Sequence, residues 1–509
     1  MNDIAFQVCN IAARKALQGK HMIIASLSRP FGALTLAALL SACAVGPDYR
    51  PPSASNLKVP ERFIADRPGA EVDLARWWTS FDDPVLTQLV ERSLAANLDV
   101  AAAGARLRQA RASLRQTQGS ALPQLDASGS ASRSVGNSGS TYVDPSTGQT
   151  LSRGGDTTVY RAGFDASWEV DLFGGIRRSV EAARANAQGS EASLHFAQLT
   201  VASEVGLNYL NARLLQARLD IARRNLASQD ETLEIVGWRV QAGLVSSLDL
   251  EQARQLRANT AATIPTLETN YNSAVNRIAV LLGEAPGAVN GLMQAIQPVP
   301  LPPQAIGAEI PAEIVQRRPD IAAAERTLAA ETARIGVATA QLYPALRLSG
   351  SFSGSDTVLS NLPDAMIGNL VAGITAPIFN GGQIRAQIEG QRASTDAALA
   401  SYRQTVLTAL EEVENALTAL SASERRQRDV QISAQAAENA VLYARSQYRA
   451  GLIDFQALLD TERGLLSAQD NRASARADRA TATVQLYKAL GGGWQAAPMP
   501  ATALSSTRP

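Results

Sequence analysis

The chain repeats itself at a fixed spacing, and this repeat constrains its fold more than any other feature. Between residues 176 and 283, many residues recur 208 positions later without a gap. The matching pairs include Glu204-Val205 with Glu412-Val413 and Leu282-Gly283 with Leu490-Gly491. Upstream the spacing is 221, so the first copy carries 13 extra residues within a stretch rich in Gly, Ser and Thr. Such self-similarity over 509 residues indicates one architecture built twice.

Each copy is expected to contain one very long helix. No proline occurs between Pro145 and Pro265, or between Pro377 and Pro498, so helices over about 175–242 and 382–450 would run without a break. At 1.5 Å per residue each would be roughly 100 Å long. A globular core cannot cover that length, so these helices must pack along one another. Apolar residues spaced 4, 3, 4 and 3 predict a coiled-coil seam of Val406, Leu410, Val413, Leu417 and Leu420.

Alternating side chains before each long helix predict β-strands. From Val159 to Leu172 apolar residues alternate with polar or small ones, and a period of 2 places the two sets on opposite faces. Weaker alternation runs through 125–132, 346–352 and 370–378. The pattern alone fits a soluble hairpin and a tilted membrane strand equally well. In the strand expected at 159–172, the polar face carries Arg161, Asp165, Glu169 and Asp171.

An apolar run near the start ends in Leu40-Ser41-Ala42-Cys43, which is typical of a lipoprotein processing signal. Its core, 31–40, is too short to span a bilayer, which takes about 20 residues, but suits a signal peptide. The thiol of Cys43 would carry a diacylglyceryl group and its freed amine a further acyl chain, which together anchor a protein stably. Because a leader of 42 residues exceeds the usual ~15–30, Met22 is the expected start. The alternative is that this apolar run is a short core helix and that Cys43 is incidental. That interpretation fits poorly with the proline-rich segment that follows.

The processing signal favours the membrane interpretation of the strands. Four strands cannot close a barrel, and an open edge in lipid would leave backbone groups unpaired. Three copies of four strands would give 12, whereas two copies would give 8, a number whose interior is largely filled by side chains. The expected fold is therefore α+β and mostly α. It is a homotrimer with a 12-stranded transmembrane β-barrel, four strands per chain, continued away from the membrane by a long α-helical barrel, which the resemblance described below places in the periplasm.

Composition argues against several other classes of protein. Lys and Arg number 47 and Asp and Glu 47, a balance that does not indicate a nucleic-acid partner. Cys9 lies in the expected leader and Cys43 at the lipidation site, so no thiol chemistry is expected. With only His21 and His195, and without a Gly-rich phosphate loop, neither a metal site nor a catalytic site is expected. We therefore expect no enzyme and no cofactor apart from the covalent lipid.

Four segments, in order along the chain, resemble the OprM/NodT-type outer membrane factor lipoproteins. These segments are CAVGPDYRPP from Cys43, WWTSFDDPVLTQLV from Trp77, RRPDIAAAE from Arg317 and LYPALRLSGSF from Leu342. Such proteins are TolC-like exit ducts of tripartite resistance-nodulation-division efflux pumps. The resemblance implies a lipid-anchored trimer of the outer membrane that extends into the periplasm and conducts small molecules passively outward. It also implies two partners, a periplasmic membrane-fusion adaptor and an inner-membrane pump.

Two kinds of functional residue are expected from the turns after the long helices. Gly243 and Gly451 can end those helices in the left-handed conformation. By resemblance the turns Ala242-Gly243-Leu244 and Ala450-Gly451-Leu452 form the periplasmic tips that dock the adaptor, and Asp460 lines the closed periplasmic mouth. The alternative for Asp460 is an exposed carboxylate paired with Arg463, which contributes little. Gln456 departs from the apolar residue expected there.

The expected domain organisation follows the repeat. It comprises a signal peptide at 1–42, a lipidated linker at 43–83, a first repeat at 84–283 with a hairpin at about 124–173, a Pro-rich equatorial linker at 284–310, a second repeat at 311–491 with a hairpin at about 345–379, and a tail at 492–509. Two other functions stay open. A duct for type I protein secretion would share the fold, and a lipid-anchored trimeric scaffold would not conduct at all.

Overall fold

The computed structural model describes residues 44–53, 57, 59–60, 63–64, 73–135, 140–143, 150–153, 156–302 and 317–494. The expected signal peptide and Cys43 lie outside the described residues. The same holds for most of the C-terminal tail and for the end of the Pro-rich linker. The domain division proposed from the sequence stays a prediction.

The chain is mostly helical with a small sheet, as expected from the sequence. In chain order the elements are η1 (Leu74–Phe81), α3 (Pro84–Ala96), α4 (Leu98–Gly119), β1 (Gln124–Ser134), β2 (Ser140–Val143), β3 (Thr150–Arg153), β4 (Thr157–Val170), α5 (Gly175–Gln241), α6 (Ser247–Leu281), α7 (Asn290–Met293), α8 (Pro319–Ala340), β5 (Ala345–Asp356), η3 (Leu359–Ala365), β6 (Met366–Thr375), α9 (Gln383–Arg449) and α10 (Phe455–Ala489).

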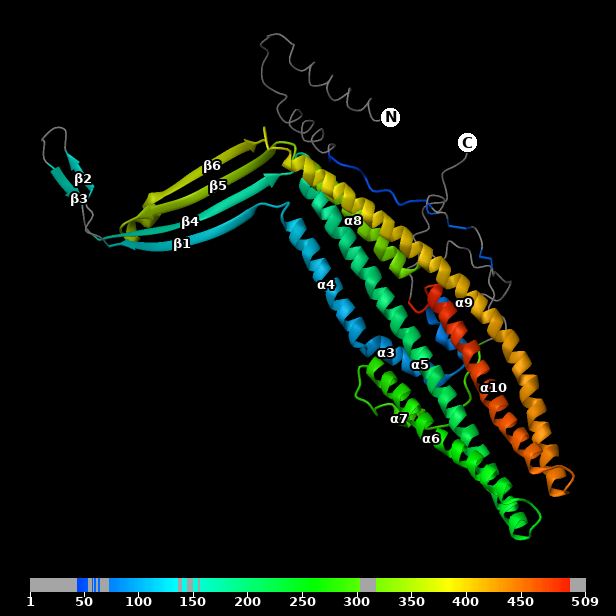
Figure 1. Ribbon diagram of the computed structural model, residues 1–509. Coiled ribbons are helices and arrows are strands. Elements are labelled where there is room, and N and C mark those ends of the chain that lie inside the picture. The colour runs from blue at the N-terminus through cyan, green and yellow to red at the C-terminus, as the bar shows by residue number, and fades with distance from the viewer. Residues whose placement is uncertain are drawn as a thin grey trace, which may run out of the picture.

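The molecule is strongly elongated. The sheet lies at one end, the long helices run away from it, and the turns that join α5 to α6 and α9 to α10 lie at the opposite end (Figure 1). Helices α5 and α9 contain 67 residues each, and α6 and α10 contain 35 each. Both α9 and α10 begin and end 208 positions after α5 and α6. Among the described residues, no helix combines the length and apolarity needed to cross a bilayer.

The main sheet contains four antiparallel strands in the order β1-β4-β5-β6. Strands β1 and β6 therefore form its two edges. Phe164 of β4 lies opposite Ala127 of β1 and Phe352 of β5, and Phe352 lies opposite Gly368 of β6. Because directly opposed residues share a face, this register aligns most apolar positions of the four strands on one side, whereas Ile367 and Val371 of β6 lie on the other. Strands β2 and β3 form a separate two-stranded sheet.

The largest core lies midway along the helices, around η1. Trp77 is fully buried and stacks on Tyr487 of α10, with ring centroids 5.7 Å apart. A Cβ on Gly206 of α5 would come within 2.7 Å of the Trp77 ring, so only glycine fits there. A second core contains the expected seam of α9, in which Leu410 is partly buried and the other four residues are buried. The spacing of apolar residues thus predicted this contact surface correctly.

The two copies use the same contact to fix the ends of α6 and α10. Asn97 donates from Nδ2 to the carbonyl oxygen of Leu281 at 2.8 Å, and Arg318 donates from Nη1 to the carbonyl oxygen of Ala489 at 2.9 Å. Asn97 and Arg318 are 221 residues apart, and Leu281 and Ala489 are 208 apart. An orphan C-terminal carbonyl of each helix is thereby bonded.

Candidate functional site: the two-faced sheet and the helical tips

One face of the sheet is mostly polar on β1, β4 and β5, while β6 adds Ile367 and Val371 to it. Arg161 of β4 lies opposite Ser130 and Ser355, and Asp165 lies opposite Asp126 and Ser351. Glu169 lies opposite Arg347 of β5, and the two side chains form an ion pair of 3.2 Å between Oε2 and Nη2. Arg161, Asp165 and Glu169 therefore share one face of β4, and serines of the neighbouring strands leave space in front of them.

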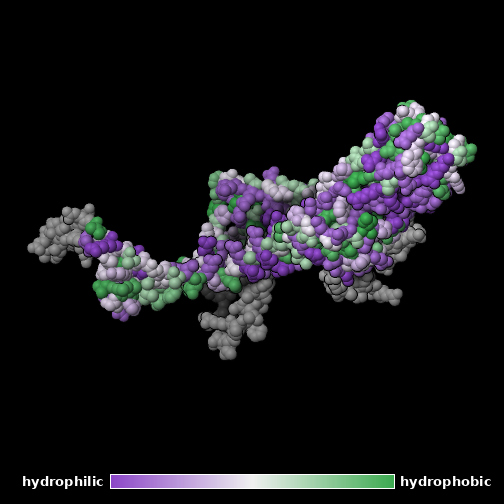
Figure 2. Space-filling model, turned by 90° about the horizontal axis from the view of Figure 1, so that it is seen from below, coloured by the Kyte–Doolittle hydropathy of each residue, from purple (hydrophilic) through white to green (hydrophobic). Residues whose placement is uncertain are grey.

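The opposite face is apolar and exposed. Large side chains with at least half of their surface exposed lie on it in all four strands: Leu125, Phe164, Phe352, Leu370 and Ile374. Figure 2 shows hydrophobic residues gathered at the sheet end of the molecule, whereas the helical body is mixed. A contiguous exposed apolar face of this kind marks contact with lipid or with another protein.

Asp171 does not belong to the polar face of β4, contrary to the prediction. The strand ends at Val170, and Asp171 accepts hydrogen bonds from the backbone N–H groups of Ile176 and Arg177 at 3.2 and 2.8 Å. Because Gly174, the residue before α5, has no side chain, Asp171 supplies the carboxylate that satisfies these orphan donors. The alternation in the sequence continues past the strand, which is why the pattern placed Asp171 wrongly.

A cavity of about 690 Å³ lies where the sheet meets the helices. Its lining includes the Glu169–Arg347 pair and Tyr343, whose ring stacks on Phe173 with centroids 4.7 Å apart. The lining also includes Ser179 of α5. The cavity thus begins at the polar face of the sheet, while most of its other lining residues are apolar.

The far ends of the helical hairpins are tight turns with exposed leucines. Gly243 and Gly451 have φ values of +70° and +72°, as predicted. The next residues, Leu244 and Leu452, are 71% and 74% exposed. Each leucine N–H bonds to a carbonyl of the last helical turn at 2.9 Å, the pattern of a Schellman end. The two tips therefore present the same backbone and the same apolar side chain.

The helices that follow the turns begin with side-chain caps. Ser246 and Asp249 form a capping box at the start of α6, and Asp454 accepts from the N–H of Ala457 at 2.9 Å at the start of α10. Behind the turns the two hairpins pack on each other through a shared core that includes Val236, Leu256, Tyr448, Phe455 and Leu459. This core holds the tips in a fixed relation.

Asp460 lies on α10, nine residues after Gly451 of the second tip. Its side chain is 60% exposed, accepts from Nε2 of Gln456 at 3.0 and 3.1 Å, and lies 3.6 Å from Nη1 of Arg463. Within one chain this is the exposed ion pair that the sequence offered as the alternative. The role of Asp460 at a closed mouth, and of the tips in docking, stays a prediction.

Comparison with known families decides between the interpretations of this fold. The profile of the family described as outer membrane efflux protein matches residues 89–284 and 310–492, which is most of the chain. The chain belongs to this family. The resemblance to OprM/NodT-type outer membrane factors is thereby confirmed.

Individual members of the outer membrane efflux family cover almost the whole chain. Nodulation protein T of Rhizobium leguminosarum bv. trifolii is 34% identical over 463 residues, 90% of this chain and 96% of the relative. The pyoverdine export outer membrane protein OpmQ of Pseudomonas aeruginosa is also 34% identical, over 90% of this chain and 95% of its own length. The solved structure of the outer-membrane channel OprN superposes with a TM-score of 0.77 at 36% identity, covering 89% of this chain and 100% of that one. OpmQ is named as an export protein and OprN as a channel.

Sequence reasoning missed a buried ionic contact near the tips of this efflux protein. Glu462 of α10 is 3% exposed and accepts from Thr232 of α5 and from Arg445 of α9. A signal was available in the repeat, because the residues 208 positions before Arg445 and Glu462 are Gly237 and Arg254. A charged pair that appears in only one copy marks a contact that the other copy does not make.

Proposed function

We propose that this outer membrane efflux protein is the exit duct of a tripartite efflux pump and conducts small molecules passively from the periplasm to the exterior. The observation that carries the proposal is the sheet with one exposed apolar face and one polar face, joined directly to 67-residue helices. A barrel of such sheets would meet lipid with its apolar face and water with its polar face. The long helices would continue the conduit into the periplasm.

Closure of the duct would require three copies of the chain. The sheet ends in two edge strands, β1 and β6, and unpaired edges are not tolerated in lipid. Pairing β6 of one copy with β1 of the next, three times over, would give the 12-stranded barrel of a homotrimer. The same rotation would arrange the helices as a cylinder.

The proposed duct would be anchored and connected at opposite ends. A lipid on Cys43 would hold the N-terminus at the inner face of the outer membrane. The tips at Gly243 and Gly451 would dock a periplasmic membrane-fusion adaptor, which in turn would connect to an inner-membrane resistance-nodulation-division pump. Exposed Leu244 and Leu452 supply the apolar contacts that such docking would bury.

Planar-bilayer recording combined with native mass measurement tests this proposal. The purified protein should have the mass of three chains and should produce stable single-channel currents. A monomer or dimer would overturn the barrel, and a trimer without conductance would favour the lipid-anchored scaffold. Deletion of the gene should sensitise cells to small toxic compounds. Loss of a secreted protein instead would favour a type I secretion duct.

A further inference from the structure

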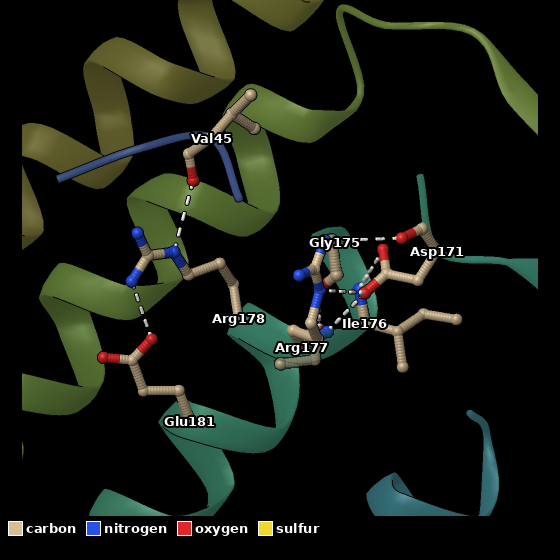
Figure 3. A network of polar contacts seen from close by, with 8 residues as sticks. Val45, Asp171, Gly175, Ile176, Arg177, Arg178 and Glu181 are labelled. Atoms are coloured by element: carbon tan, nitrogen blue, oxygen red, sulfur yellow. Dashed lines mark hydrogen bonds and ion pairs between the residues drawn. The ribbon is translucent and has the colours of Figure 1, made fainter. Parts of the chain in front are cut away.

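The first residues that the structure describes lie across the junction between the sheet and the helices, and Arg178 holds them there (Figure 3). Arg178 is only 5% exposed. Its Nε donates to the carbonyl oxygen of Val45 at 3.2 Å, and its Nη2 donates to that of Gly46 at 3.3 Å and to Oδ1 of Asp48 at 2.7 Å. Nη1 is occupied by Glu181 at 2.8 Å. One buried guanidinium therefore binds three successive parts of the segment 44–48, which we call the N-terminal strap.

Close backbone contacts fit the N-terminal strap into its place. The N–H of Val45 donates to the carbonyl oxygen of Phe173 at 3.1 Å, just after β4. A Cβ on Gly46, whose φ is +97°, would lie 2.4 Å from Cα of Gly336 in α8, and a Cβ on Gly174 would lie 2.8 Å from Cα of Ala44. Glycine is therefore required on both sides of the contact.

The residue that follows the N-terminal strap is also held by α8. The hydroxyl of Tyr49 donates to Oε1 of Glu325 at 2.9 Å, and the guanidinium of Arg326 lies 5.8 Å from the centre of its ring. Burial, with the nearby carboxylate of Glu325, raises the pKa of the Tyr49 phenol. The segment thus follows a continuous path from the start of α5 along α8.

The internal repeat shows that this path is a specific feature of one junction. The two copies agree at Arg177 and Arg385 and at Glu181 and Glu389. They differ at the residues that contact the segment 44–49. In the other copy, Ala386 stands in place of Arg178 and Arg115 in place of Gly336. Gly104 and Ala105 stand there in place of Glu325 and Arg326. The second junction therefore lacks the guanidinium, the space and the ion pair that bind this segment.

We propose that Arg178 is a positioning residue for the membrane anchor: by holding the N-terminal strap, it fixes Ala44 at the edge of the sheet that faces the helices, so that a lipid on the preceding residue would start from this edge. Ala44 lies against Gly174, and adjacent Cα atoms are about 3.8 Å apart, so the attachment point of such a lipid would be one residue from a fixed position. Released at residues 44–48, the anchor could move by roughly 17 Å. The inference rests on the proposed lipidation of Cys43.

The test is a spin label on the N-terminal strap of the lipidated trimer in nanodiscs. Cysteines occur only at positions 9 and 43, so Pro47→Cys, at an exposed position, gives one label site in the mature chain. We expect an immobile label at one depth. Arg178→Ala should shorten its rotational correlation time at least threefold and broaden its depth, measured by accessibility to oxygen and to a water-soluble nickel complex.

Two further variants keep this result interpretable. Arg223→Ala is the control, because Arg223 also lies on α5 but pairs at the surface with Glu268 of α6 at 2.7 Å. Asp48→Ala removes one strap contact from a side chain that is 82% exposed, so it should mobilise the label without disturbing the helices. An equally mobile label with Arg178 present, or an unchanged depth in Arg178→Ala, would overturn the proposal, as would an equal effect of Arg223→Ala. Conductance of the same samples tests the duct separately, since loss of current with an immobile label would count against the duct alone.

Discussion

Arg445 of α9 and Glu462 of α10 form an ion pair of 3.1 Å whose carboxylate is almost completely buried. Thr232 of α5 donates to the same Oε1 atom at 2.9 Å, and Arg445 also contacts Ser228 of α5. One carboxylate thus joins three helices next to the shared core of the two tips. A buried carboxylate is costly unless it is fully paired, so this contact fixes the relative position of the two hairpins.

Replacing Glu462 with alanine should loosen the tips. Arg445 and Thr232 would lose their common acceptor, and a loss of about 2–3 kcal/mol in local stability is expected, below the full value for buried pairs because Arg445 is 31% exposed. Amide hydrogen exchange should accelerate in residues 228–256 and 441–462. Glu251→Ala is the control, since Glu251 pairs with Arg254 at the surface and should contribute little. Equal protection in both variants would contradict the role of Glu462.

The features of this fold that could be predicted from the sequence are those encoded locally. The absence of proline, the positive-φ glycines and the 4-3 spacing located the long helices, the tips and the seam of α9. Alternation correctly separated the two faces of β4. Asp171 was misplaced because a helix cap and a strand residue look alike in an alternating pattern.

The buried polar contacts could not be predicted from local patterns. Glu462 and Arg178 lie on helices whose sequences give no sign of burial, and their partners are up to 230 residues away. Which carboxylate meets which guanidinium depends on how several helices align in space. Comparison of the two copies would have indicated both residues, because each is replaced by an unrelated residue at the equivalent position.

Replacing Gly451 with valine should impair docking without preventing assembly. No atom lies near the position of a new Cβ, so the cost comes from the φ of +72°, about 1–3 kcal/mol of local strain for a β-branched residue. The trimer should still form, while drug resistance should fall. Gly464→Ala is the control, because Gly464 lies within α10 with open space around it. Normal resistance in Gly451→Val would count against a docking role for this tip.

Tyr209 should contribute stability that is lost in alkali. Its buried phenol donates to Asp83 and accepts from Nε of Arg213 at 3.0 Å. Burial, followed by the bond to Asp83, raises the pKa of Tyr209 above its usual 10. The folded state therefore favours the protonated phenol, and its contribution is fully present below pH 10 and lost as the pH rises through the folded pKa.

Tyr209→Phe isolates this contribution from those of other tyrosines. At pH 8 the variant should be less stable by about 1.5–3 kcal/mol, because it loses a hydrogen bond to a charged group. The difference in thermal unfolding temperature between the two proteins should shrink between pH 10 and pH 12. A constant difference across that range would show that Tyr209 does not titrate in this way.

Cys43→Ser should abolish attachment of the lipid. The thiol is the acyl acceptor in the proposed processing reaction, so the variant should incorporate no radiolabelled palmitate and should keep its leader on a gel. Ser41→Ala is the matched control, because it keeps a small residue before Cys43, and it should be processed normally. Label retained by Cys43→Ser would place the lipid elsewhere.

Asp460→Ala should raise the resting conductance of the duct. In the proposed trimer three carboxylates near one axis would attract cations, and divalent ions would bridge them. Asp460 contacts Gln456 and Arg463 but is 60% exposed, so its carboxylate remains accessible to such a ring. Removing it should increase basal current and weaken divalent block. Asp249 is the comparison residue on the other hairpin: it caps α6 by accepting from the N–H of Ser246 at 3.3 Å, so Asp249→Ala should affect helix stability far more than current. Planar-bilayer recordings of the two variants decide the matter, since equal currents would move the gate elsewhere along α10.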